Sequence, residues 1–170
     1  MSLRRILVCA AWVLVGLIGV SPCRAQAMPG TAGETLSGKR IVLADATRDH
    51  AAVLVAGFSH EGGNGTGPWV KALRADKALD GVAVYQVAML AGAPGFIRGT
   101  IKSGMRKGTA AADQEQFVVL TQDDKLWRQF FGVTTDKDPY VVLLDAKGDL
   151  VWRGHGPAER LEPELKAAVR

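Results

Sequence analysis

Two histidines and two carboxylates in this sequence are of the types that bind transition metals or transfer protons. His60 and Glu61 follow a long apolar run, Asp138 precedes a proline, and His155 ends a short apolar segment near the C-terminus. Imidazole and carboxylate groups are common zinc ligands, and histidine exchanges protons near neutral pH. Because these residues are far apart in the sequence, a shared site depends on the fold that brings them together.

The N-terminus predicts export of the protein. Arg4 and Arg5 precede the apolar run 6–20, and a short polar stretch follows and ends at Ala27. This order is typical of a secretory signal peptide, and the apolar run is shorter than the roughly 20 residues of a membrane-spanning helix. We therefore predict a signal peptide over residues 1–27 and a periplasmic or secreted protein. An uncleaved N-terminal anchor is the alternative.

Charge and cysteine content argue against two classes of function. The predicted signal peptide contains three arginines and no acidic residue, so its removal lowers the net charge from +4 to +1. We therefore expect no nucleic-acid binding. Both cysteines, Cys9 and Cys23, lie in the same segment. The rest of the chain has no thiol, so dithiol chemistry is not expected of it.

The pattern of apolar segments predicts an α/β domain over residues 40–170, preceded by a flexible leader over 28–39. Strands are expected at 40–44, 51–58, 82–89, 117–120, 140–144 and 150–153, and helices at 68–75, 96–106, 123–131 and 158–169. The strand at 51–58 is almost continuously apolar, which is typical of a strand covered on both faces. The glycine-rich stretch 59–67 is predicted to be a loop.

The C-terminal part of the chain resembles the second half of the thioredoxin fold. A helix ending LWRQFFGV is followed by a proline that enters a strand, the hairpin YVVLLDAKGDLVW and a terminal helix. The resemblance implies a central mixed sheet flanked by helices, with a C-terminal β-hairpin and helix. It also implies that Pro139 holds the place of the family's cis-proline. The family's redox cysteines would fall between Phe58 and Trp69, where this chain reads SHEGGNGTGP.

A narrower resemblance links the chain to the assembly-factor family of the mitochondrial F-type ATP synthase. The motif GFIRG at 95–99, the following SGMRKG and the late block VVLLDAKGDLVWRGHGPAE are similar to that family. Its members are associated with chaperone-like binding, so the resemblance implies binding and assembly. The predicted secretory signal is a departure from the mitochondrial members and leaves the client open.

A thioredoxin-like sheet would place several polar residues at one end. The segment after strand 51–58, the turn before strand 140–144 and the end of the C-terminal hairpin would meet there. We therefore predict a binding edge formed by Ser59, His60, Glu61, Trp69, Asp138, Pro139 and His155. If a transition metal binds, His60 and His155 are its expected ligands. Solvated loop ends without a site are the alternative.

A second candidate surface is a basic stripe on the helix predicted at 96–106. Its residues are Arg98, Lys102, Arg106 and Lys107. The first three recur every four residues, so they share one helix face beside an apolar stripe. Such a stripe would suit acidic lipid headgroups or an acidic partner. An ordinary solvated helix face is the alternative.

Together these observations predict an exported, non-redox thioredoxin-like binding protein that acts as a chaperone or assembly factor. The expected partner is a protein client, such as a subunit of a membrane or envelope complex, and the basic stripe would allow proximity to a membrane. A metal-binding or metal-delivery protein using His60 and His155 is the first alternative, and no other cofactor is expected. A thioredoxin-superfamily oxidoreductase is the second alternative, which the lack of cysteine disfavours.

Overall fold

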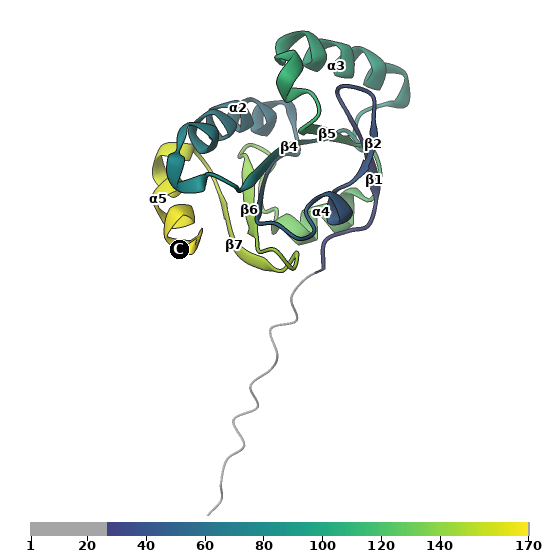
Figure 1. The fold of residues 1–170 in the computed structure, drawn as a ribbon. Coiled ribbons are helices and arrows are strands. Elements are labelled where there is room, and N and C mark those ends of the chain that lie inside the picture. Colours follow the sequence, from purple (N-terminus) through teal and green to yellow (C-terminus); the bar gives the residue numbers. More distant parts are fainter. Residues whose placement is uncertain (1–26, 170) are drawn as a thin grey trace, which may run out of the picture.

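The computed structural model describes residues 27–169, which form a seven-stranded sheet with helices on both faces (Figure 1). The predicted signal peptide lies outside the described residues, apart from its last residue. The strands are β1 (Ala32–Thr35), β2 (Arg40–Val42), β3 (Ala52–Gly57), β4 (Ala83–Met89), β5 (Phe117–Leu120), β6 (Tyr140–Leu144) and β7 (Leu150–His155). The helices are α1 (Leu43–Ala46), α2 (His60–Ala75), α3 (Gly95–Gly108), α4 (Asp124–Phe131) and α5 (Ala158–Val169), with short 3₁₀ turns η1 (Lys77–Leu79) and η2 (Ala111–Asp113).

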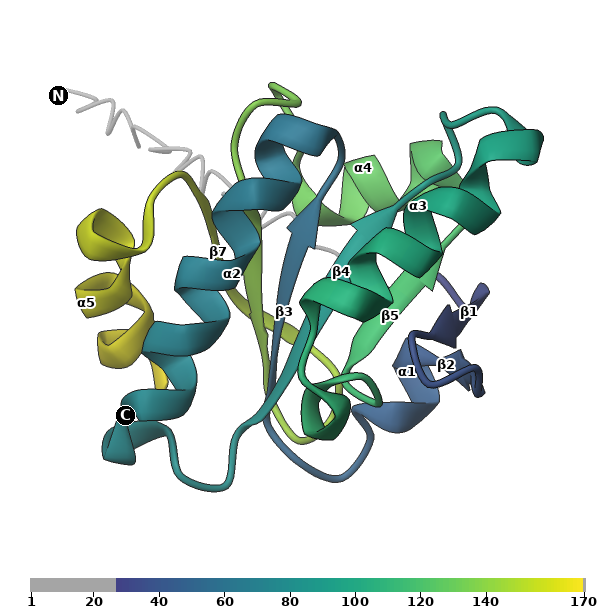
Figure 2. The ribbon, with the colours of Figure 1, turned by 90° about the horizontal axis from the view of Figure 1, so that it is seen from above.

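The sheet is mixed, with the strand order β2-β1-β5-β4-β3-β6-β7. β3, β4 and β5 run parallel, whereas β6 is antiparallel to β3 and pairs with β7 in the C-terminal hairpin. α2 and α3 lie in front of the parallel strands in Figure 2, and α4 lies behind them. Every residue of β3 is buried, so its unbroken apolar sequence does belong to a strand covered on both faces. No helix within the described range is long and apolar enough to cross a bilayer.

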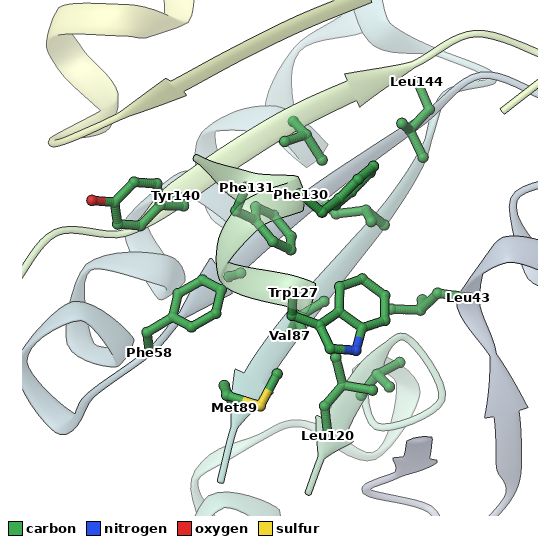
Figure 3. Close-up of a cluster of buried hydrophobic side chains, with 14 residues drawn as sticks. Leu43, Phe58, Val87, Met89, Leu120, Trp127, Phe130, Phe131, Tyr140 and Leu144 are labelled. Carbon is green, nitrogen blue, oxygen red and sulfur yellow. The ribbon is translucent and has the colours of Figure 1, made fainter. Parts of the chain in front are cut away.

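Two apolar clusters fill the space on either side of the sheet. Leu54 and Ala56 of β3 point into one cluster and Val53 and Val55 into the other, as the alternation of side chains along a strand requires. α4 packs into the first cluster, which Figure 3 shows, and α2 and α5 pack into the second. The three aromatic residues on α4 serve packing, because all of Trp127, Phe130 and Phe131 are buried.

The segment predicted to be a flexible leader belongs to the domain instead. Its residues 32–35 form β1, which lies between β2 and β5, and Leu36 is fully buried. A Cβ added at Gly33 would lie 2.7 Å from the Val118 side chain, so this glycine lets β1 approach β5 closely. Small residues that are typical of a loop therefore serve a closely packed strand here. The strand predicted at 40–44 is also shorter, because α1 begins at Leu43.

Helix α2 begins earlier than the sequence predicts. The glycine-rich stretch 59–67 is helical from His60 onward, and Pro68 lies inside the helix, where its ring removes one backbone hydrogen bond. Ser59 caps the helix, since its hydroxyl accepts a hydrogen bond from the Gly62 amide at 3.1 Å. The prediction of a loop is wrong because contacts between these glycines and the turn before β6 outweigh the low helix propensity of glycine.

The C-terminal half matches its predicted elements closely. α4 ends at Phe131 and is capped by Gly132, whose φ of 68° lies in the left-handed region that favours glycine. In the β6–β7 turn, the side chain of Asp145 accepts hydrogen bonds from the amides of Lys147 at 2.8 Å and Asp149 at 2.9 Å. Gly148 supplies the positive φ of 83° that the turn needs. Local turn chemistry therefore accounts for the success of these predictions.

Candidate functional site

One end of the sheet brings together the segments that the sequence predicted to form a binding edge. β3 leads into α2 at this end, and β6 begins beside it, because Ala56 pairs with Tyr140. His155, the last residue of β7, also pairs with Tyr140. The start of α2, the turn before β6 and the end of β7 therefore meet. We call this surface the α2 edge, and its members are Ser59, His60, Glu61, Asp136, Asp138 and His155.

The turn before β6 packs directly on the first turns of α2. A Cβ at Gly62 would lie 2.7 Å from the carbonyl oxygens of Asp136 and Asp138, and one at Gly65 would lie 2.8 Å from the Pro139 ring. Real Cβ atoms do not approach other heavy atoms this closely, so glycine is the residue that fits at these two helical positions without a shift of the turn. The glycines that indicated flexibility in the sequence therefore serve close packing.

The Ser59 hydroxyl joins α2 to the same turn. It donates a hydrogen bond to the carbonyl oxygen of Asp136 at 2.5 Å while it accepts one from the Gly62 amide. One hydroxyl thus satisfies a helix amide and a loop carbonyl together. The first turn of α2 is fixed by these bonds at the place where the resemblance to thioredoxin locates redox cysteines.

His155 and Asp138 form a polar pair on the α2 edge. Nδ1 of His155 lies 2.8 Å from a carboxylate oxygen of Asp138, and the imidazole stacks on the Tyr140 ring with centroids 5.2 Å apart. The Tyr140 hydroxyl is engaged elsewhere, because it donates to the carbonyl oxygen of Thr135 at 2.9 Å. Since Asp138 occupies Nδ1, the ring nitrogen through which His155 can bind a ligand or partner is Nε2.

Arg128 secures the other side of the turn and was missed by the sequence analysis. It pairs with Asp124 at 2.6 Å and with Asp136 at 2.5 Å, and its guanidinium carbon lies 5.2 Å from the centroid of the Phe58 ring. The hydrogen bond from Arg128 holds the pKa of Asp136 below its ordinary value, and the same bond raises the pKa of Arg128. The spacing of Asp124 and Arg128 predicts their pairing, whereas the pairing with Asp136 depends on the loop.

Five of the predicted edge residues reach solvent. His60 and Glu61 are exposed, and Ser59, Asp138 and His155 are partly exposed. The fold therefore brings the start of α2 and the Asp138–His155 pair to one accessible surface. Side chains held by bonds to the protein itself, as in that pair, lose little freedom when a partner binds.

Two predicted edge residues belong to the interior instead. Trp69 is fully buried, and its indole Nε1 donates a hydrogen bond to the carbonyl oxygen of Gly156 at 2.8 Å. Trp69 faces the sheet because it lies on the apolar side of α2. Pro139 is buried against Gly65. No peptide bond between described residues is cis, so the expectation of a cis bond at Pro139 is wrong.

The two predicted metal ligands do not join a larger cluster. Among the residues that the structure describes, no group of three or more His, Cys, Asp or Glu side chains is arranged to hold a metal ion. A metal at the α2 edge would therefore depend on His60, on Nε2 of His155 and on further ligands from water or a partner. The metal alternative stays a prediction.

Three residues of the predicted basic stripe on α3 bond to their own domain. Arg98 donates to two carbonyl oxygens of the β4–α3 loop, both at 2.8 Å. Lys102 pairs with Glu34 of β1 at 2.5 Å, and Arg106 donates at 2.6 Å to the backbone carbonyl that follows β1. Lys107 is exposed. These contacts hold α3 on the domain, and binding of the stripe to lipid or an acidic partner stays a prediction.

A hollow of about 610 Å³ lies away from the α2 edge, between β1 and the segment after β5. Its charged lining residues are Glu34, Arg40, Lys102 and Asp123. Glu34 and Lys102 pair with each other, and Asp123 accepts a hydrogen bond from Thr31. Because most of these charges are satisfied within the chain, the α2 edge remains the candidate site.

Comparisons with known proteins identify the fold. The sequence matches no protein-family profile and no curated protein sequence. A putative thiol:disulfide interchange protein DsbE from Chlorobium tepidum superposes with a TM-score of 0.59 at 18% identity, over 86% of this chain and 97% of its own. StoA from Bacillus subtilis gives a TM-score of 0.53 at 18% identity, over 84% and 100% of the two chains.

A third similar structure is BsSco, a member of the Sco family of cytochrome c oxidase assembly proteins. Its TM-score is 0.59 at 8% identity, over 86% of this chain and 92% of its own. Identities this low establish the fold and no activity. The narrower resemblance to ATP synthase assembly factors stays a prediction. The chain has a thioredoxin-like fold, as its C-terminal motifs predicted.

Proposed function

We propose that this chain is an exported, non-redox thioredoxin-like binding protein that serves as a chaperone or assembly factor for a membrane or envelope complex. The observation that carries the proposal is the first turn of α2. It reads Ser59-His60-Glu61-Gly62, and residues 28–170 contain no cysteine. Without a thiolate the domain has neither the nucleophile nor the resolving group of disulfide exchange.

The geometry of the α2 edge supports protein binding. His60 and Glu61 are exposed at the start of α2, and the oriented Asp138–His155 pair lies on the same end of the sheet. These groups are held by a capped helix and a tightly packed turn, so a partner would meet a surface formed in advance. Such a mixture of charged and hydrogen-bonding groups suits a polar partner surface.

Two comparisons support an assembly role. BsSco belongs to a family of cytochrome c oxidase assembly proteins, so this fold serves the assembly of a membrane complex in a structural neighbour. The motif GFIRG and the late block of the sequence resemble ATP synthase assembly factors. The predicted signal peptide would deliver the protein outside the cytoplasm, where envelope complexes are accessible.

Affinity purification from native membranes tests the proposal. The tagged full-length protein is expressed in its own host, and co-purifying proteins are quantified by mass spectrometry. We expect subunits of one membrane or envelope complex, with recovery reduced at least about fivefold by Glu61→Lys, because a reversed charge at an interface costs on the order of 1 kcal/mol or more. The matched control is Asp80→Lys, an exposed acid beside the opposite end of β4. Equal recovery with both variants would contradict the proposal.

An insulin-reduction assay separates binding from thiol chemistry. With dithiothreitol as the reductant, we expect the protein to leave the rate of insulin precipitation at its uncatalysed value. Cys9 and Cys23 are the two cysteines of the chain, so replacement of both by serine gives a protein without thiols. Catalysis by this variant would refute the non-redox assignment. Catalysis that is lost on their replacement would refute it too and would locate the chemistry in the N-terminal segment.

Metal binding is the second candidate function, and the bond between Asp138 and Nδ1 of His155 favours it. A carboxylate in this position orients an imidazole so that Nε2 can bind a metal. The test is titration of the purified protein with zinc or copper, followed by calorimetry. His60→Ala and His155→Ala should each abolish stoichiometric binding, whereas His50→Ala, before β3 at the other end of the sheet, should not. Binding that survives both edge substitutions would exclude this site.

A further inference from the structure

Helix α3 is attached to the domain less firmly than the other long helices. All fourteen residues of α3 are described, and none of them is buried. α4 has eight residues and buries three of them, and α2 buries five of sixteen. Because burial of an apolar face supplies most of the stability of a helix in a protein, α3 gains least from packing. Figure 2 shows it on the outside of the sheet, beside α2.

The apolar side of α3 covers a third, smaller cluster. Ile101 and Met105 are only partly buried over Leu36, Leu90 and Phe117, which are buried themselves. The largest apolar side chain of the helix, Phe96, is 88% exposed and adds nothing to this contact. The cluster is therefore closed by a helix that has few apolar contacts of its own.

Four glycines weaken α3 further, and packing does not require them. They are Gly95, Gly99, Gly104 and Gly108. A Cβ added at any of the four would have no described atom within 4 Å of it, apart from the helix backbone and its chain neighbours. This is the opposite of Gly62 and Gly65 in α2, where a Cβ would clash. A glycine inside a helix lowers the helix-forming equilibrium about fivefold relative to alanine.

Contacts of charged side chains, and not apolar contacts, attach α3 to the domain. Arg98 and Arg106 donate to backbone carbonyl oxygens, and Lys102 pairs with Glu34 at 2.5 Å. The side chains of the Lys102–Glu34 pair are 21% and 46% exposed, so water and salt weaken the pair. The ion pair therefore contributes little to the stability of α3, whereas the arginine hydrogen bonds fix its position.

We propose that α3 is a displaceable lid, which opens while the rest of the domain stays folded and so uncovers the apolar cluster beneath it. Weak packing, unneeded glycines and reliance on a partly exposed ion pair act in this direction, because each keeps the free energy of opening α3 low without affecting the central sheet. Opening of α3 does not depend on whether the α2 edge binds a client.

Hydrogen exchange of the full-length protein, followed by mass spectrometry, tests this lid. Under conditions where exchange reports the opening equilibrium, amides of α3 should exchange at least about 100-fold faster than those in the middle of α2 and α4. Gly99→Ala and Gly104→Ala should each slow exchange throughout α3 about fivefold. Lys102→Gln should speed it about two- to fivefold.

Gly63→Ala provides the matched control. Gly63 lies in α2, and a Cβ there would also meet open space, so this substitution should leave exchange in α3 unchanged. The lid is refuted if α3 exchanges as slowly as α2 and α4. It is also refuted if Gly99→Ala and Gly104→Ala leave exchange in α3 unchanged, since its amides would then exchange through local fluctuations that do not open the helix as a unit.

Discussion

Asp136 joins two helices at the α2 edge through different parts of one residue. Its carboxylate binds Arg128 of α4, while its carbonyl oxygen accepts the Ser59 hydroxyl at the start of α2. The same carbonyl oxygen leaves no space for a side chain at Gly62. Asp136 therefore contacts α4 through its side chain and the start of α2 through its backbone, although the residue itself is exposed.

The Arg128–Asp136 pair should make stability depend on pH in the acidic range. Because the folded pKa of Asp136 is lowered by Arg128, the pair stabilises the fold fully above the unfolded pKa of about 3.9 and loses this effect as the pH falls through the folded pKa. Asp136→Asn should therefore reduce the free energy of unfolding by less than about 1 kcal/mol at pH 7, since the carboxylate is half exposed. Urea unfolding at pH 7 and pH 2.5 measures this. A difference between the two proteins that persists at pH 2.5 would disprove the ionic cause.

Trp69 should contribute to stability and not to binding. Trp69→Phe removes the indole donor and leaves the carbonyl oxygen of the buried Gly156 without its bond, which costs about 1–3 kcal/mol, and the lost ring volume adds to this. Urea unfolding gives the free energy. Trp152→Phe is the control, because Trp152 is only partly buried, and its effect should be smaller. Equal effects of the two substitutions would contradict the assigned role of the indole hydrogen bond.

The glycine-rich stretch of helix α2 contains two kinds of glycine, one in close contact with a neighbouring segment and one facing open space. Gly62 and Gly65 face the turn before β6, whereas Gly63 and Gly67 have open space at their Cβ positions. The close contact of the first pair lets the backbone of the turn lie directly on the helix. Sequence alone does not distinguish the two pairs, because both read as the glycines of a flexible loop.

Alanine substitutions in α2 should distinguish the two kinds of glycine. Gly65→Ala places a methyl group 2.8 Å from the ring of Pro139 and should destabilise the protein by about 1–3 kcal/mol through overpacking. Gly63→Ala meets open space and should stabilise it by up to about 1 kcal/mol through helix propensity. Thermal unfolding midpoints measure both effects. Two shifts of the same sign would argue against the contact between α2 and the turn.

For the whole molecule, the fold could be predicted wherever local signals and tertiary structure agree. The unbroken apolar run of β3, the Gly132 cap of α4 and the Asp145–Gly148 turn each specify their element locally. The prediction was wrong where glycine was read as flexibility, at β1 and at the start of α2. In both places a neighbouring chain segment explains the glycine, and such contacts are not visible in one sequence.

The candidate site was predicted in part for the same reason. His60, Glu61, Asp138 and His155 come to one end of the sheet because strand direction in this fold places them there. Burial of Trp69 and Pro139 and the bridging by Arg128 depend on side-chain packing, which the order of elements does not determine. The topology of a fold thus locates a site, and packing decides which residues in it reach a partner.

Photo-crosslinking can determine whether the α2 edge binds a client without thiol chemistry. A benzoylphenylalanine replaces Glu61 in one variant and Asp80 in a second, both exposed, and irradiated cells are analysed for adducts. We expect adducts between the Glu61 variant and a subunit of a membrane or envelope complex, unaffected by N-ethylmaleimide, and none of these adducts with the Asp80 variant. The same adducts from both variants, or adducts from Glu61 that N-ethylmaleimide abolishes, would contradict it.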